Sequence, residues 1–241
     1  MVKFCYYIKG VKTMLYKKNS QKTLSKELFK NPTSEYRGTP FWSWNTKLEK
    51  DELFRQIGIF KEMGFGGAHM HVRTGMATPY LSDEYMNLIK SCVNKAKGED
   101  MLAWLYDEDR WPSGAAGGLV TKEKRYRGRY LLFTPTPYDN GKNAIKSEHG
   151  SAEAERAENG QLLACYDIAL DPNGYLVNWT VIDEDTPAQH EKWYAYMECA
   201  TADPWFNNNA YVDTLEPAAI EKFIKTTHEK YKKAVGNHFG K

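Results

Sequence analysis

The stretch FGGAHMHV, residues 65–72, decides the fold of this chain. It is an apolar run that starts directly after Gly64, where a segment with helical periodicity ends. Two further apolar runs flank it, PFWSWN at 40–45 and MLAWLY at 101–106. Each run is predicted to be a strand, and continuous apolar character is typical of parallel strands that are covered on both faces.

The segments between these runs have the periodicity of helices. Apolar residues recur at helical spacing from Leu53 to Met63, after a TKLE capping box at 46–49. A second helix is predicted to start after Ser82 and to end at Gly98. The order strand–helix–strand–helix–strand, at this spacing, predicts a parallel α/β sheet.

The pattern then changes. The apolar runs RYLLF, LLACYDIAL and LVNWTVI are separated by polar, turn-rich stretches without a helical segment, which predicts an antiparallel insertion over 129–192. The run from Trp193 to Cys199 is predicted to return to the parallel sheet as its fourth strand. Pro217 is predicted to start the last helix, which ends at Gly236.

About four strand–helix units are predicted, whereas a closed (β/α)₈ barrel has eight units in roughly 250 residues. We therefore expect an α/β fold that is a partial (β/α)₈ TIM barrel with an antiparallel β insertion, and an open α/β sheet is the alternative. The predicted domains are an N-terminal extension (1–35), the first part of the barrel (36–128), the β-rich insertion (129–192) and a truncated continuation of the barrel (193–241).

Charge and cysteine content argue against several classes of protein. The 33 basic and 31 acidic residues leave a net charge of +2, so neither nucleic acid nor a membrane surface is expected as a partner. The four cysteines are scattered, which predicts neither a zinc knot nor a disulfide framework. No signal peptide or membrane span is recognisable, so a cytoplasmic location is expected, or a periplasmic or extracellular one if an upstream signal is missing.

Aromatic residues make up 14% of the chain, with seven Trp and 16 Tyr. Two explanations stay open for this content. Aromatic side chains can fill a large core, or they can form a site that stacks flat ligands such as sugar rings.

Charged and aromatic residues collect at one end of the predicted strands. Ligands of parallel α/β folds bind at the carboxyl ends of the strands, and the opposite ends, near Phe65 and Met101, show no comparable cluster. A binding face is therefore predicted at the carboxyl ends. Its predicted residues are Trp42, Trp44, Asn45, His69, His71, Arg73, Asp107, Glu108, Asp109, Arg110, Trp111 and Glu198.

Two spacings within this set allow more than one chemistry. His69 and His71 share one face of a strand, as a metal-binding pair would, but histidines that bond to carboxylates or ligand hydroxyls give the same pattern. Asp107 and Asp109 also share a face, and Glu108 points the other way. One of these carboxylates is predicted to accept from a sugar hydroxyl, to bind calcium or to act as a general acid, and an ionic network with the neighbouring arginines is the structural alternative.

Four motifs in order carry a resemblance to a known family: PFWSWN, GFGGAHMHVRTGM, YDEDRWPSGAAGG and YVDTLEPAAIEKFI. Over residues 36–241 the chain resembles the amino-terminal part of the barrel of alpha-L-rhamnosidase-like glycoside hydrolases (glycoside hydrolase family 106-like). The residues that match the sugar-facing half of that barrel mouth are Trp44, Asn45, His69, His71, Arg73, Asp107, Glu108 and Trp111.

The resemblance implies a function and a larger protein. The implied function is an exo-acting glycoside hydrolase, or a fragment of one, for a terminal deoxysugar of a plant or microbial polysaccharide. Calcium is the candidate cofactor, and the remainder of the barrel and β-sandwich domains are expected in the full-length protein.

This chain departs from the family pattern in its acidic residues. An acidic motif of the DEP kind is expected on the next strand and does not occur, so the catalytic acid is expected beyond residue 241. Asp107 and Glu108 are the catalytic candidates that remain. At most one of them acts, because adjacent residues on one strand cannot straddle a glycosidic bond. A metal-dependent hydrolase that uses His69 and His71, or a non-catalytic sugar-binding fragment, are the competing classes.

Overall fold

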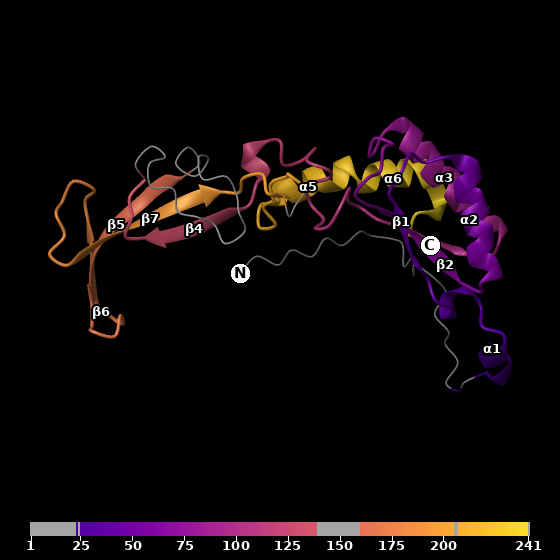
Figure 1. The fold of residues 1–241 in the computed structure, drawn as a ribbon, viewed down its shortest axis with the longest axis horizontal. Coiled ribbons are helices and arrows are strands. Elements are labelled where there is room, and N and C mark those ends of the chain that lie inside the picture. Colours follow the sequence, from indigo (N-terminus) through magenta and orange to yellow (C-terminus); the bar gives the residue numbers. More distant parts are fainter. Residues whose placement is uncertain (1–22, 24, 139–159, 205–206, 241) are drawn as a thin grey trace, which may run out of the picture. The chain divides into compact units, whose positions relative to one another are not determined.

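The computed structural model describes residues 23, 25–138, 160–204 and 207–240 (Figure 1). The chain divides into two compact units. The first unit comprises the residues up to Tyr106 together with those from His228 onward, and the second unit comprises Asp107 to Thr227.

A parallel sheet forms the centre of the first unit. Its strands β1 (Phe41–Trp44), β2 (Gly67–Val72) and β3 (Leu102–Leu105) lie in the order β1-β2-β3. Both neighbouring pairs are parallel, with Trp42 opposite Met70 and Met70 opposite Leu105. The predicted parallel order of these three apolar runs is confirmed.

The helix after β2 begins where the sequence predicts it. Helix α3 (Asp83–Gly98) has Ser82 as its N-cap, and the Ser82 hydroxyl accepts a hydrogen bond from the N–H of Tyr85 at 3.1 Å. This contact satisfies one of the free N–H groups of the first turn. Asp83, in the first turn, adds a negative charge at the positive end of the helix dipole.

The helix after β1 begins later than the sequence predicts. Helix α2 (Lys50–Glu62) has Glu49 as its N-cap without a side-chain cap, so the predicted capping box at 46–49 is wrong. The cause is a contact with a residue distant in the sequence. The N–H of Leu48 donates to Thr78 Oγ1 at 2.9 Å and the Leu48 side chain is buried, which holds this segment outside the helix.

Both helices pack on the same face of the sheet. The Trp42 ring meets Phe60 of α2 edge-on at 5.4 Å between centroids, and the Trp44 ring meets Tyr85 of α3 in the same way at 5.8 Å. Helix α6 (His228–Val235) packs against α3. The remaining elements of the first unit are α1 (Lys26–Lys30), η1 (Ser34–Tyr36) and η5 (Gly236–His238).

The second unit contains an antiparallel sheet. Its strands β4 (Arg129–Thr134), β5 (Gln161–Leu170), β6 (Leu176–Ile182) and β7 (Glu191–Cys199) lie in the order β4-β7-β5-β6. All described pairs are antiparallel, which confirms the predicted antiparallel β-rich segment. The unit also contains η2 (Lys124–Tyr126) and α5 (Pro217–Thr226).

Strand β7 corrects the expectation that 193–199 continues the parallel sheet. The segment is a strand, but it pairs antiparallel with β4 and β5. In this position the Trp193 ring of β7 stacks on the Phe133 ring of β4, at 5.1 Å between centroids. Cross-strand pairs of this kind stabilise a sheet.

The predicted last helix is two helices. Helix α5 starts at Pro217, as predicted, but it ends at Thr226, and α6 starts at His228. The hydroxyls of Thr226 and Thr227 donate to the carbonyls of Lys222 and Phe223, four residues earlier. Such back-bonding by β-branched residues bends helices, and it accounts for the break.

The chain is thus a mixed α/β protein with a three-stranded parallel sheet and a four-stranded antiparallel sheet. Among the described residues, no helix combines the length and the apolar character that a membrane span requires.

Candidate functional site

The face of the parallel sheet opposite the helices carries a row of aromatic and histidine side chains. In register, Phe41 of β1 lies opposite His69 of β2, and His69 lies opposite Trp104 of β3. Partners at the same height in parallel strands point to the same face, and residues one position away point to the other. The His69 ring stacks on Trp104 at 5.3 Å with an interplanar angle of 15°.

His71 lies between two aromatic rings on this same face. Its centroid is 3.9 Å from that of Phe41 and 3.6 Å from that of Tyr106. Its Nδ1 is 2.7 Å from the carbonyl oxygen of Val72. A carbonyl oxygen only accepts hydrogen bonds, so Nδ1 carries the proton and Nε2 of the neutral ring has the lone pair.

The surroundings favour the neutral form of both histidines. Burial lowers the pKa of His69, and burial is also the main cause that lowers the pKa of His71. The carbonyl of Val72 opposes this shift at His71, whereas the charge of Arg73 reinforces it. Two neutral imidazoles offer a polar ligand both donor and acceptor nitrogens.

We call these side chains the open face: Phe41, His69, His71, Arg73, Trp104 and Tyr106. The Phe41 side chain is 56% exposed, and the guanidinium of Arg73 lies over its ring at 5.8 Å. The described helices α2 and α3 pack against the opposite face of the sheet. Trp104 and Phe41 were missed at the sequence level, although the period of two from His69 and His71 was the available signal.

Two predicted binding residues lie on the other face. Trp42 and Trp44 are buried among the helices, with 6% and 2% of their surfaces exposed. Asn45, which directly follows β1, is exposed. The structure thus brings His69, His71 and Arg73 together and places the two tryptophans in the hydrophobic core.

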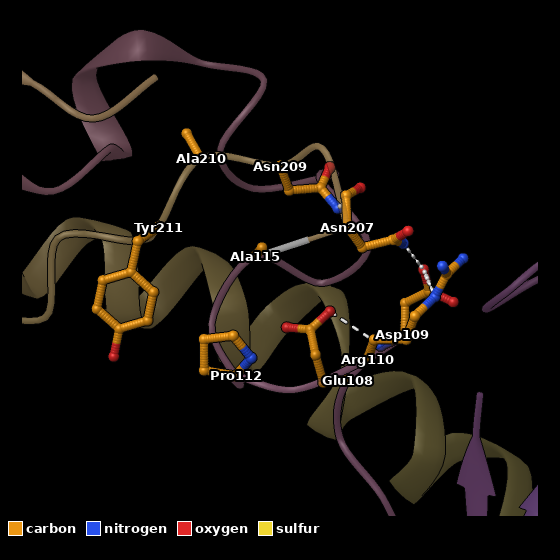
Figure 2. Close-up of a pocket in the computed structure, with 9 residues that line it drawn as sticks. All are labelled: Glu108, Asp109, Arg110, Pro112, Ala115, Asn207, Asn209, Ala210 and Tyr211. Atoms are coloured by element: carbon orange, nitrogen blue, oxygen red, sulfur yellow. Dashed lines mark hydrogen bonds and ion pairs between the residues drawn. The ribbon is translucent and has the colours of Figure 1, made fainter. Parts of the chain in front are cut away.

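Glu108, in the second unit, is enclosed by four backbone N–H groups, of which Figure 2 draws the contact with Asp109. Its side chain is 1% exposed. Oε2 accepts from the N–H groups of Gly114 and Ala116 at 2.9 and 2.8 Å. Oε1 accepts from those of Asp109 and Gly117 at 2.9 and 2.5 Å. The carboxylate therefore holds the loop that follows it in a closed turn.

The glycines of this loop are needed for its shape. Gly114 has φ +130° and Gly117 has φ +62°, conformations that side chains disfavour. A Cβ atom on Gly114 would overlap Cγ1 of Val212. The sequence GAAGG therefore forms a tight turn whose N–H groups are directed at Glu108.

The pKa of the Glu108 carboxyl is subject to opposing effects. Burial raises this pKa above its ordinary value, and the four backbone N–H groups act in the opposite direction. Each of these donors is already bonded to the carboxylate. The geometry is that of a carboxylate that holds its loop in place.

The two aspartates beside Glu108 have different surroundings. Asp109 accepts from Asn207 Nδ2 at 2.9 Å and lies 3.6 Å from Nε of Arg110 (Figure 2). Burial raises the pKa of Asp109, and these two neighbours oppose the shift. Asp107 accepts from the Ser113 hydroxyl at 2.6 Å and is half-buried.

The cavity beside this loop is small. Its volume is about 10 Å³, and its lining includes Glu108, Asp109, Arg110 and Asn207 (Figure 2). This is room for about one water molecule and not for a sugar ring. Trp111, at 60% exposed, does not line it.

Glu198 lies apart from this loop. It belongs to β7, opposite Tyr130 of β4, and its side chain is 1% exposed. Burial raises its pKa, and a hydrogen bond with Tyr130 acts in the opposite direction. Glu198 lines a different groove of the second unit from Glu108.

The described residues do not include three or more His, Cys, Asp or Glu side chains arranged to hold a metal ion. This holds for the His69 and His71 pair and for the carboxylates after β3 alike.

Comparisons with known proteins give a weak result. No protein-family model matches the chain, and no curated protein matches it. One structure with some similarity is that of a rhamnosidase from Novosphingobium sp. PP1Y, at 18% identity and a TM-score of 0.39. The match covers 63% of this chain and 17% of that one.

Proposed function

We propose that this chain is a glycoside hydrolase-like fragment that binds a terminal deoxysugar at the open face of its first unit. The observation that carries the proposal is the row of Phe41, His69 and Trp104, extended by His71 and Tyr106. The motif resemblance to alpha-L-rhamnosidase-like enzymes supports the same class of ligand.

The arrangement of helices supports a barrel as the larger fold. Helices α2 and α3 both pack on the face that carries Trp42 and Trp44, and the strands follow in sequential order. When successive strands are added on the same side of the sheet by right-handed crossovers, all the connecting helices lie on one face, as in a (β/α)₈ barrel. A doubly wound sheet instead has helices on both faces. We infer that β1, β2 and β3 begin such a barrel and that the open face is turned to its interior.

The chemistry of the open face suits a sugar ring. The faces of Trp104 and Tyr106 can pack against sugar C–H groups. Nε2 of His71 can accept from a hydroxyl, and Arg73 can donate to one. A deoxysugar has both an apolar methyl group and hydroxyls, and this mixed lining offers partners for both.

We assign Glu108 a structural role and leave Asp107 as a catalytic candidate. Glu108 positions its loop, because both of its oxygens are bonded to backbone N–H groups. Asp107 is the remaining catalytic candidate in this chain. Hydrolysis of a glycoside uses two carboxyl groups, and the partner of Asp107 is expected on a later strand of the proposed barrel.

Binding rather than turnover tests this proposal, because the chain is expected to lack one catalytic carboxyl group. L-rhamnose and methyl α-L-rhamnoside are titrated into the chain in a calorimeter. We expect Trp104→Ala to weaken binding by roughly tenfold, as loss of a stacked ring should. Trp179→Ala is the control, since it removes an exposed tryptophan (56%) that lies on β6, away from the open face. Equal binding by both variants, or no binding of either sugar, would refute the proposal.

A further inference from the structure

Helix α6 is connected to the open face through one tyrosine. The hydroxyl of Tyr231 donates to the carbonyl oxygen of Tyr106 at 2.8 Å, between positions 125 residues apart in the chain. Tyr106 directly follows β3, so its carbonyl lies past the last residue of that strand. The contact with Tyr231 therefore holds the backbone at the point where the chain leaves the parallel sheet.

The hydrogen bonds at this contact run in one direction. The hydroxyl oxygens of Tyr231 and of Tyr85 in α3 are 2.9 Å apart. A carbonyl oxygen only accepts, so Tyr231 uses its one hydroxyl proton on Tyr106, and Tyr85 is the donor to Tyr231. Tyr85 and Tyr231 are 0% and 2% exposed, and a buried polar group that loses its partner is costly. This burial favours keeping both bonds made.

Helix α6 is itself anchored on α3. The Tyr231 ring meets the Tyr85 ring edge-on at 6.4 Å between centroids, and Val235 is buried in the core of the first unit. The ammonium group of Lys230 donates to the carbonyl of Leu81, just before α3, at 2.7 Å. The Tyr231 hydroxyl therefore has a fixed position from which it holds Tyr106.

The side chain of the same Tyr106 belongs to the open face. Its ring lies on the His71 ring at 3.6 Å between centroids, with 24° between the planes. Burial is the main cause that lowers the pKa of His71, and a ring at this distance contributes to that burial. Since α6 holds the backbone of Tyr106 and the Tyr106 ring covers His71, a shift of the backbone moves the ring.

We propose that Tyr231 is a positioning residue of the open face, which acts through Tyr106. Its side chain is buried, so it contacts Tyr106 and not a ligand. It sets how the Tyr106 ring lies over His71, and thereby how well the two rings receive a sugar, because partners that are already ordered bind at a lower entropic cost. The effect on sugar binding rests on the function proposed above, whereas the effect on His71 does not.

Tyr231→Phe and Tyr85→Phe are matched variants that test this role. Each removes one buried hydroxyl, but only Tyr231→Phe removes the bond to Tyr106. NMR titration of the whole chain measures the pKa of His71, whose signal is identified by its absence in His71→Gln. We expect Tyr231→Phe to raise this pKa toward 6.5, because water reaches the imidazole, and Tyr85→Phe to leave it unchanged. An unchanged pKa in Tyr231→Phe, or an equal rise in both variants, would overturn the proposal.

Calorimetry with methyl α-L-rhamnoside gives a second readout. We expect Tyr231→Phe to weaken binding by roughly fivefold, about the cost of ordering one side chain, and Tyr85→Phe to leave binding unchanged. A rise in the pKa of His71 without a change in affinity would also overturn the proposal. If the wild-type chain binds no rhamnoside, the proposed function is wrong, and the titration of His71 alone decides whether Tyr231 positions Tyr106. Melting temperatures check folding, and the two variants should lose similar amounts.

Discussion

The N–H of Gly114 donates to Oε2 of Glu108 at 2.9 Å, which ties the Glu108 side chain to a turn six residues later in the chain. Three more N–H groups converge on the same carboxylate. Glu108→Gln replaces one oxygen by an amide group that can only donate, and so leaves backbone donors without an acceptor. We expect a loss of about 2–3 kcal/mol in the free energy of unfolding, measured by urea denaturation.

Asp107→Asn is the control for that change. Asp107 accepts from the Ser113 hydroxyl, and an asparagine oxygen can still accept this bond. We expect a change of less than about 1 kcal/mol in the free energy of unfolding. Equal losses in the two variants would contradict the structural role of Glu108. Under the proposed function, Asp107→Asn should abolish turnover of an aryl rhamnoside in any active form of the protein without loss of stability.

Gly114→Ala should destabilise the protein. Gly114 has φ +130°, and an added Cβ would overlap Val212. We expect a cost of about 2 kcal/mol or more, measured as a fall in melting temperature and in unfolding free energy. The control is Gly58→Ala in the interior of α2, where an added Cβ meets nothing within 4 Å. That change should stabilise by about 0.5–1 kcal/mol, and a loss of stability there would contradict the structure of α2.

The open face predicts a pH dependence of stability. The folded pKa values of His69 and His71 are below the ordinary 6.5, so the unfolded chain binds more protons than the folded one just below pH 6.5. The stability contributed by the neutral rings is therefore complete above pH 6.5, and it is lost as the pH falls from 6.5 to the folded pKa values, below which both states are protonated. Urea denaturation between pH 8 and pH 5 measures this loss. A variant with both His69→Gln and His71→Gln should lose stability less steeply, and an unchanged slope would contradict the assignment.

The histidine pair is not expected to hold zinc. Its rings stack on Trp104 and Tyr106, and a third ligand is absent from the described residues. We expect metal analysis of the purified chain to find no stoichiometric zinc, and chelator treatment to leave the melting temperature unchanged. One zinc per chain, lost in His69→Ala or His71→Ala, would favour the metal-dependent alternative.

The parallel sheet was predictable from the sequence because its signals are local. Three apolar runs are separated by segments with helical periodicity, and Ser82 marks a helix start by its own side chain. The partner of β7 was not predictable in this way. Strand pairing depends on residues distant in the sequence, and the match of Trp193 with Phe133 joins positions sixty residues apart (193 − 133).

The candidate site was predictable in part for a related reason. The alternation of a strand places His69 and His71 on one face and Trp42 and Trp44 on one face. It does not say that these are opposite faces of the same sheet, because that follows from register between strands. The burial of Glu108 was also beyond the sequence, since its partners are main-chain groups that any residue type supplies.

The hydrogen bonds to Glu108 also make the backbone shape of its loop independent of the exposed side chains that the loop carries. Because the donors are peptide N–H groups, an exposed side chain such as that of Trp111 can change without removing any of these hydrogen bonds. A lineage or a designer could therefore diversify recognition at this position while Glu108 and the glycines stay fixed. Tolerance to substitution should therefore be high at Trp111 and low at Gly114.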